Sequence, residues 1–202
     1  MLIRRQFLAS IALIAAGVWT SGPALAQSGA PEAGAFIQGL GEEAVRTFSD
    51  KGLPREQALR RFQSLLHKGF DVPYIGRWVL GRFWNQATEQ QQGDYQRLFE
   101  QLIIKTYAGR FLEYSGETFK VTGVRTEGDS DSMVSTQIVR PNGPPVNLDW
   151  RVRRRDGHFK IIDVVVEGVS MGVTQRQEFA SVIQQNGGKV EGLLQALRQK
   201  VG

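Results

Sequence analysis

The fold is decided by the stretch from Val146 to Val166, which reads VNLDWRVRRRDGHFKIIDVVV. Apolar and polar residues alternate from Val146 to Arg153, which is the pattern of a strand with one buried face. Asp156-Gly157 is typical of a two-residue hairpin turn. The run that begins at Phe159 is apolar on both faces, which favours a central strand covered on both sides. The stretch therefore predicts an antiparallel pair of strands inside a larger sheet.

Two further strands precede this pair, and helices flank the sheet. Phe119, Val121 and Val124 indicate the first strand, with Gly123 as a candidate bulge, and the second runs from Met133 to Val139. Elsewhere apolar residues recur at a helical period. Helices are expected at 35–48, 54–69, 71–83, 88–114, 174–185 and 189–200.

These elements predict an α+β fold. N-terminal helices come first, then a four-stranded antiparallel curved sheet, then C-terminal helices that can pack back on the sheet. A curved sheet wrapped by helices has a cone-like shape, and we expect it to enclose an apolar pocket.

The first 26 residues are typical of an export signal. Arg4 and Arg5 precede an apolar run from Phe7 to Trp19, and Ala24-Leu25-Ala26 matches a cleavage site. The run is shorter than the roughly 20 residues of a membrane span. The arginine pair also resembles a twin-arginine signal, so the general-secretory and twin-arginine routes both stay open. We expect a signal peptide at 1–26, a flexible lead-in at 27–34 and a single domain at 35–202.

Composition excludes several kinds of chemistry. The chain has 25 Lys and Arg against 20 Asp and Glu, a mild excess that requires neither a membrane nor nucleic acid as a partner. The absence of Cys excludes disulfides, thiol catalysis, thiolate metal sites and a lipid-anchored lipoprotein. With only His67 and His158, a histidine metal centre is not expected either. We expect no metal and no cofactor.

Three carboxylates are the candidates for catalysis. Asp163 and Glu167 share a face of the last strand, and Asp149 lies on its neighbour, so acid–base work beside an apolar pocket is one interpretation. In the structural alternative Asp163 pairs with an arginine or caps the backbone, and Glu167 ends the strand in solvent. We favour this alternative, because the sequence holds no hydrolase elbow, P-loop, dinucleotide fingerprint or zinc-protease motif.

Arginines crowd the end of the third strand, at positions 151, 153, 154 and 155. They could form a patch for lipid phosphates. A solvated strand end and turn is the commoner meaning of such a run.

Several segments, in order, resemble one family. The resemblance covers about residues 35–200 and rests on a set of short motifs, each weak alone. These are YIGRWVLG at 74–81 with Trp84; the acidic and Gln-rich segment 88–99; Thr106-Tyr107-Ala108 with Arg110 and Tyr114; Lys160 with Asp163-Val164; and Glu167-Gly168-Val169-Ser170 with Arg176 and Phe179. This set is similar to the MlaC family of periplasmic phospholipid carriers, also called the toluene-tolerance auxiliary family. A hopanoid-associated branch of that family stays open.

The resemblance implies a periplasmic shuttle that catalyses no reaction. Such carriers hold a glycerophospholipid as cargo and exchange it between an outer-membrane lipoprotein complex and an inner-membrane ABC transporter, which maintains outer-membrane lipid asymmetry. We expect a monomer with no nucleic-acid partner. The alternatives are a non-transporting binding module, such as a hopanoid-associated factor or a lipoprotein chaperone, and an enzyme that uses Asp163 on a hydrophobic substrate.

For a pocket of this kind we predict a lining of large apolar residues from helices and sheet. The candidates are Ile75, Val79, Leu98, Leu102, Tyr107, Phe111, Val121, Val134, Leu148, Trp150, Ile162, Val164, Val169 and Met171. Near the mouth, head-group or partner contacts are predicted for Arg77, Arg110 and Arg176. The alternative role of these arginines is a structural ion pair.

Overall fold

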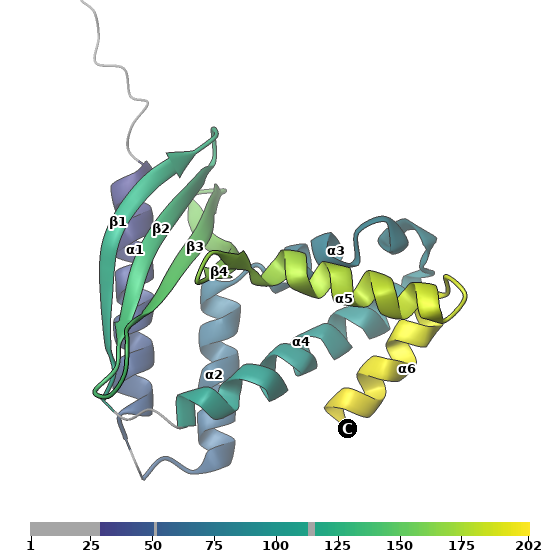
Figure 1. The fold of residues 1–202 in the computed structure, drawn as a ribbon, viewed down its shortest axis with the longest axis horizontal. Coiled ribbons are helices and arrows are strands. Elements are labelled where there is room, and N and C mark those ends of the chain that lie inside the picture. Colours follow the sequence, from purple (N-terminus) through teal and green to yellow (C-terminus); the bar gives the residue numbers. More distant parts are fainter. Residues whose placement is uncertain (1–28, 51, 113–115) are drawn as a thin grey trace, which may run out of the picture.

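The computed structural model describes residues 29–50, 52–112 and 116–202, and its elements confirm the α+β class. Figure 1 shows a curved sheet with α1 lying along it, the helices α3 to α6 gathered to the right of the sheet, and α2 between the sheet and these helices. The elements are α1 (Gly29–Phe48), α2 (Arg55–Gly69), α3 (Val72–Leu80), the 3-10 helix η1 (Gly81–Gln86), α4 (Glu89–Leu112), β1 (Thr118–Glu127), β2 (Asp131–Val139), β3 (Val146–Arg155), β4 (His158–Val166), β5 (Val169–Ser170), α5 (Met171–Gln185) and α6 (Val190–Val201).

The sheet is an antiparallel meander in the order β1-β2-β3-β4-β5, one strand more than predicted. Asp156 and Gly157 both have positive φ, as the mirror-image hairpin turn requires. Glu167 and Gly168 repeat this geometry and add the two-residue β5, which the sequence reading missed. The predicted bulge is confirmed, because the β1–β2 register shifts between Val121 and Gly123.

Helix α1 begins earlier than expected and packs closely on β1. Residues 29–34, predicted to belong to a flexible lead-in, form its first turns, and Ala33 is fully buried. Glycines permit the close approach. A Cβ at Gly41 would lie 2.4 Å from the Phe119 ring, and one at Gly34 would lie 2.8 Å from Val124. Gly34, which belonged to the predicted lead-in, therefore serves as a contact point with the sheet. The proposed signal peptide lies outside the described residues.

Local capping sets the ends of the helices that follow. The Asp71 carboxylate accepts from the Tyr74 backbone N–H at 3.1 Å, and the predicted capping box between Thr88 and Gln91 opens α4. Helix α3 ends at Leu80, before the predicted 83, because Gly81 has a positive φ of 58°. Helix α5 begins at Met171 instead of 174, because Ser170 caps it.

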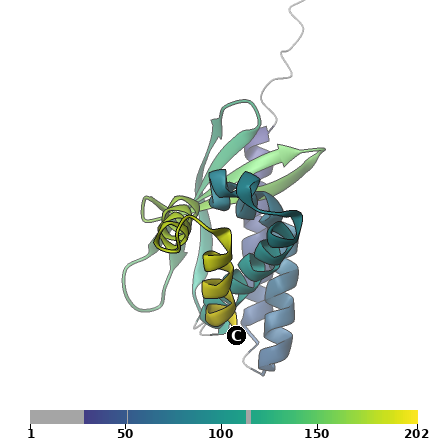
Figure 2. The same ribbon diagram turned by 90° about the vertical axis from the view of Figure 1, so that its right-hand side faces the viewer.

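The buried apolar residues form two clusters. The helical cluster lies among α2 to α6 and includes Tyr95, Phe99 and Phe179. The sheet cluster lies between α1 and the sheet, with Ile37, Val134 and Ile161 at its centre. Figure 2 shows the helical layer from its own side, with α5 and α6 in front. Phe70, the residue after α2, packs against both clusters. Within the described ranges, no helix combines the length and the apolar character that a bilayer crossing needs.

Candidate functional site

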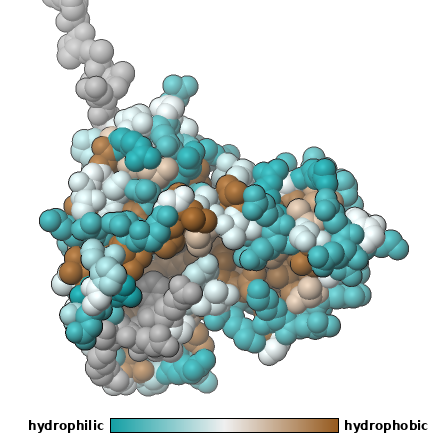
Figure 3. Space-filling view, in the orientation of Figure 1, coloured by the Kyte–Doolittle hydropathy of each residue, from teal (hydrophilic) through white to brown (hydrophobic). Residues whose placement is uncertain are grey.

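The sheet cluster carries a set of half-buried apolar residues around Trp150, here called the Trp150 group: Phe70, Phe119, Val121, Trp150 and Val164. The Phe70 and Phe119 rings each meet the Trp150 ring edge-on, with centroids 6.4 Å apart. All five lie against fully buried residues, yet each keeps accessible surface. In Figure 3 the surface is hollowed between the sheet and the helical layer, and hydrophobic residues gather there.

The polar atoms beside the Trp150 group are satisfied internally. Trp150 Nε1 donates to Thr136 Oγ1 at 2.8 Å, and Thr136 Oγ1 donates to the Leu148 carbonyl at 3.2 Å. Thr136 is 2% exposed. Because these groups already have hydrogen-bond partners, the surface that faces a ligand is apolar, and a ligand does not need to form hydrogen bonds with it.

The structure divides the predicted lining residues between the two clusters. The sheet cluster takes Val121, Val134, Trp150 and Val164, whereas the helical cluster takes Ile75, Val79, Leu98, Leu102 and Tyr107. Leu148 is buried, Met171 is half-buried at the start of α5, and Val169 is 52% exposed on β5. The side chain of Phe111 lies outside the described part of the chain.

The register of β4 decides which of its residues join the sheet cluster. Val164 pairs with Trp150, but a register shift between Arg151 and Val152 brings Ile161 opposite Val152. Ile161 therefore joins Val164 in the sheet cluster, and the predicted lining residue Ile162 is displaced from simple alternation.

Sequence reasoning missed Phe70 and Phe119 as members of the Trp150 group. Phe119 carried a strand signal that could have placed it beside Val121. Phe70 sits between the end of α2 and the cap of α3, where it forms an isolated bridge to Ile161. Neither the helical period nor the alternation of a strand marks a residue in such a position as part of a site.

Two of the three predicted mouth arginines meet in one surface depression. Arg77 of α3 stands over the Trp84 ring at 5.7 Å, and Arg176 of α5 stands over the Trp78 ring at 5.4 Å. Both line a depression of about 250 Å³, together with Tyr74, Trp78, Gly81, Trp84 and Asn85. The structural ion pair proposed for them is not found among the described residues. The Arg110 side chain lies outside those residues.

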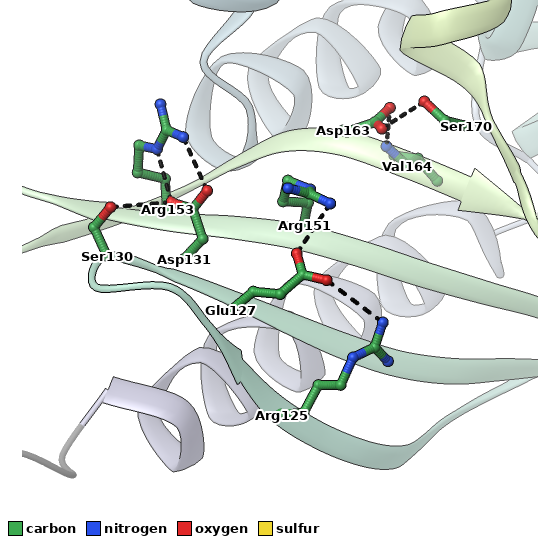
Figure 4. A network of polar contacts seen from close by, with 9 residues as sticks. All are labelled: Arg125, Glu127, Ser130, Asp131, Arg151, Arg153, Asp163, Val164 and Ser170. Atoms are coloured by element: carbon green, nitrogen blue, oxygen red, sulfur yellow. Dashed lines mark hydrogen bonds and ion pairs between the residues drawn. The ribbon is translucent and has the colours of Figure 1, made fainter.

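The candidate catalytic carboxylates act as structural acceptors. Asp163 accepts from Val164 N at 2.9 Å, Ser170 Oγ at 2.6 Å and Gly172 N at 3.1 Å, and Figure 4 shows the first two bonds. It therefore caps backbone at the start of α5, as the structural alternative predicted.

The other two carboxylates are also engaged. Glu167 accepts from the backbone N–H and the side-chain amide of Asn147, and these bonds hold the pKa of Glu167 below its usual range. Asp149 accepts from Ser135 Oγ at 2.5 Å. The three groups thus hold parts of the sheet together and do not converge on one site.

The arginine run on β3 is internally paired, which argues against a phosphate patch. Arg151 meets Glu127 at 3.0 Å and Arg153 meets Asp131 at 2.8 Å, as Figure 4 shows. The hydrogen bonds from Arg153 lower the pKa of Asp131. The remaining pairs are Arg154 with Glu32 and Arg155 with Asp156.

The fold and site define a small α+β domain in which a curved sheet presents half-buried aromatic residues toward a layer of helices. The family model described as MlaC protein matches residues 41–199. The chain therefore belongs to the MlaC family, which confirms the resemblance found in the sequence motifs.

The chain is also similar to two known proteins of this kind and to a solved structure. The chain is 23% identical over 110 residues to toluene tolerance protein ttg2D of Pseudomonas putida, covering 54% of this chain and 51% of that protein. It is 25% identical over 133 residues to the intermembrane phospholipid transport system binding protein MlaC of Haemophilus influenzae, covering 64% of this chain and 61% of that protein. The chain thus spans about half to three-fifths of these relatives.

A phospholipid-binding protein from Ralstonia solanacearum, solved in complex with a phospholipid, shares the fold with a TM-score of 0.73 at 31% identity. The similarity covers 84% of this chain and 96% of that one.

Proposed function

We propose that this protein binds a phospholipid with its acyl chains against the Trp150 group. The observation that carries the proposal is the similarity, over nearly the whole chain of that protein, to a protein solved with a phospholipid bound. The half-buried Trp150 group supports it, because large apolar side chains that keep exposed surface beside a buried core are characteristic of ligand sites.

The size of the apolar term explains why such a site must be enclosed. Exposing hydrocarbon to water costs about 0.8 kcal/mol per methylene, so a phospholipid with two acyl chains of roughly 30 carbons in all pays on the order of 20 kcal/mol to leave a membrane unshielded. A carrier has to offset most of this cost by enclosing the chains, and it must still release the lipid. Apolar contact without fixed polar partners meets both requirements, and the polar atoms around Trp150 are already hydrogen-bonded to one another.

We further propose that the protein is a periplasmic shuttle between an outer-membrane lipoprotein complex and an inner-membrane ABC transporter, and that it catalyses no reaction. Membership of the MlaC family supports the shuttle. The engagement of Asp163 with three donors argues against its use as an acid or base.

The test is native mass spectrometry of the protein purified from cells, with extraction and identification of any lipid. We expect about one phospholipid per protein. A protein that stays empty, even after incubation with phospholipid vesicles, would overturn the proposal. A hopanoid as the extracted lipid would favour the hopanoid-associated alternative.

Two matched variants locate the site. Val121 lies in the Trp150 group, whereas Val139 on the paired strand is 42% exposed. We expect Val121→Trp to fill the site and lose the lipid, and Val139→Trp to retain it. Circular dichroism must show that both variants are folded. A folded Val121→Trp protein with full lipid content would place the acyl chains elsewhere.

A further inference from the structure

The depression between α3, η1 and α5 is a built feature with a positive charge. Its lining includes two arginines, two tryptophans, a tyrosine and an asparagine, and it contains no acidic residue. Helix α5 reaches this position because Gly172 leaves room for Trp78, whose ring would lie 2.8 Å from a Cβ there. Gly81, at positive φ, provides the same room under Arg176, whose guanidinium would lie about 3.0 Å from a Cβ.

Both guanidiniums are held by ring faces instead of carboxylates. Arg77 lies over Trp84 and Arg176 over Trp78, and within residues 29–50, 52–112 and 116–202 neither forms an ion pair. A guanidinium stacked on a ring keeps the N–H groups at its edge available and gives up little conformational freedom when an anion binds. The arginines of β3 provide a contrast, because all four are paired with carboxylates.

We propose that this depression is a docking site for an acidic segment of a partner protein, whose carboxylates bind the edges of Arg77 and Arg176. The chemistry of the lining favours a protein, because tryptophan, tyrosine and arginine are the residues that dominate the energetics of protein interfaces. The shape also favours a protein. A depression of about 250 Å³ accepts one or two side chains, whereas membrane anchoring uses aromatic rings that project into the interface.

The inference goes beyond the proposed lipid carriage and does not require it, because the depression and the Trp150 group consist of different residues.

The experiment measures binding of a fluorescein-labelled hexaglutamate peptide to the purified protein by fluorescence anisotropy at low ionic strength. The test variant is Arg77→Gln with Arg176→Gln. The control is Arg55→Gln with Arg61→Gln, which removes the same charge from exposed positions on α2. We expect the test variant to bind about tenfold or more weakly and the control to bind like the wild type, because bidentate guanidinium–carboxylate bonds are the strong ones.

A second variant tests the stacking itself. Trp84→Leu keeps the charge and releases Arg77 from its ring, so we expect binding about threefold weaker through lost preorganisation. Unchanged binding in this variant would contradict the role given to the ring.

The other outcomes overturn the proposal. They are no peptide binding by the wild type, an equal loss in test and control variants, or binding to pure phosphatidylglycerol vesicles that depends on Arg77 and Arg176 while the peptide does not bind. Lipid content from native mass spectrometry should be the same in all variants, so the two proposals can fail separately.

Discussion

Replacing Asp163 by Asn distinguishes a structural carboxylate from a catalytic one. Its Oδ1 accepts from the backbone N–H groups of Val164 and Gly172, and its Oδ2 accepts from the Ser170 hydroxyl. Ser170 in turn caps α5 by accepting from Val173 N at 3.0 Å. One side chain therefore joins β4, β5 and the beginning of α5. The Asn variant keeps the shape but loses the charge.

The magnitude follows from these contacts. Hydrogen bonds to a charged group are worth about 1.5–3 kcal/mol and neutral ones about 0.5–1.5 kcal/mol, so three weakened bonds suggest a loss of about 2–3 kcal/mol. The charge also lies at a helix N-terminus, which contributes in the same direction. For a domain of this size we expect the melting temperature to fall by roughly 5–10 °C.

The assay is urea unfolding together with lipid content by native mass spectrometry. Asp149→Asn is the matched control. Asp149 lies on the adjacent strand and accepts a hydrogen bond from the Ser135 hydroxyl, so the loss of stability should be about 1 kcal/mol or less. The folded Asp163→Asn protein should still carry lipid. Equal losses in the two variants, or no loss in Asp163→Asn, would refute the structural role. A lipid-loaded Asp163→Asn protein that had lost a measured enzymatic activity would favour the enzyme.

Two further predictions concern stability. Arg153 holds the pKa of Asp131 below its usual 3.8, so the pair stabilises the fold above that value and the contribution is lost as the pH falls through the lowered pKa. Asp131→Asn should flatten the loss of stability below about pH 4, and an unchanged slope of urea midpoint against pH would contradict this. Gly41→Ala should cost about 1–3 kcal/mol by driving a methyl group into Phe119. Gly39→Ala, with no atom within 4 Å of the new Cβ, should gain about 0.5–1 kcal/mol, and thermal melts showing the same sign for both would rule out the close packing of α1.

The sequence predicted best those elements whose signal is local. The alternation in β3, the turn at Asp156-Gly157 and the Thr88 capping box depend on neighbours in the chain, and all three are confirmed. The sequence placed the start of the first helix at residue 35, whereas α1 begins at Gly29, because glycine residues can have two opposite effects on a helix. A glycine-rich stretch lowers helix propensity, but it also permits the close contact with β1 that stabilises the helix, and only the tertiary structure decides between them.

The site was only partly predictable, for a related reason. A helical or alternating period shows that a side chain is buried, but not which layer it meets. Leu98 and Trp150 therefore appeared equivalent in the sequence, yet they belong to different clusters. Ile161, and not Ile162, joins the sheet cluster because a register shift is a property of two strands together. Arg77 and Arg176 lie far apart in the chain, and the family motifs suggested them where physical patterns alone did not.

The glycines of α1 also decide how readily the interior can be reached. Gly34, Gly39 and Gly41 each lower helix stability by about 1 kcal/mol relative to alanine, and most helical stability in proteins comes from tertiary packing. The helix is therefore maintained by the sheet that it covers. In hydrogen exchange, the amides of α1 should open at a lower free energy than those of α4, whose Tyr95 and Phe99 lie deep in the helical cluster. Local opening of this one helix would expose the sheet cluster while the β-sheet hydrogen bonds stay intact.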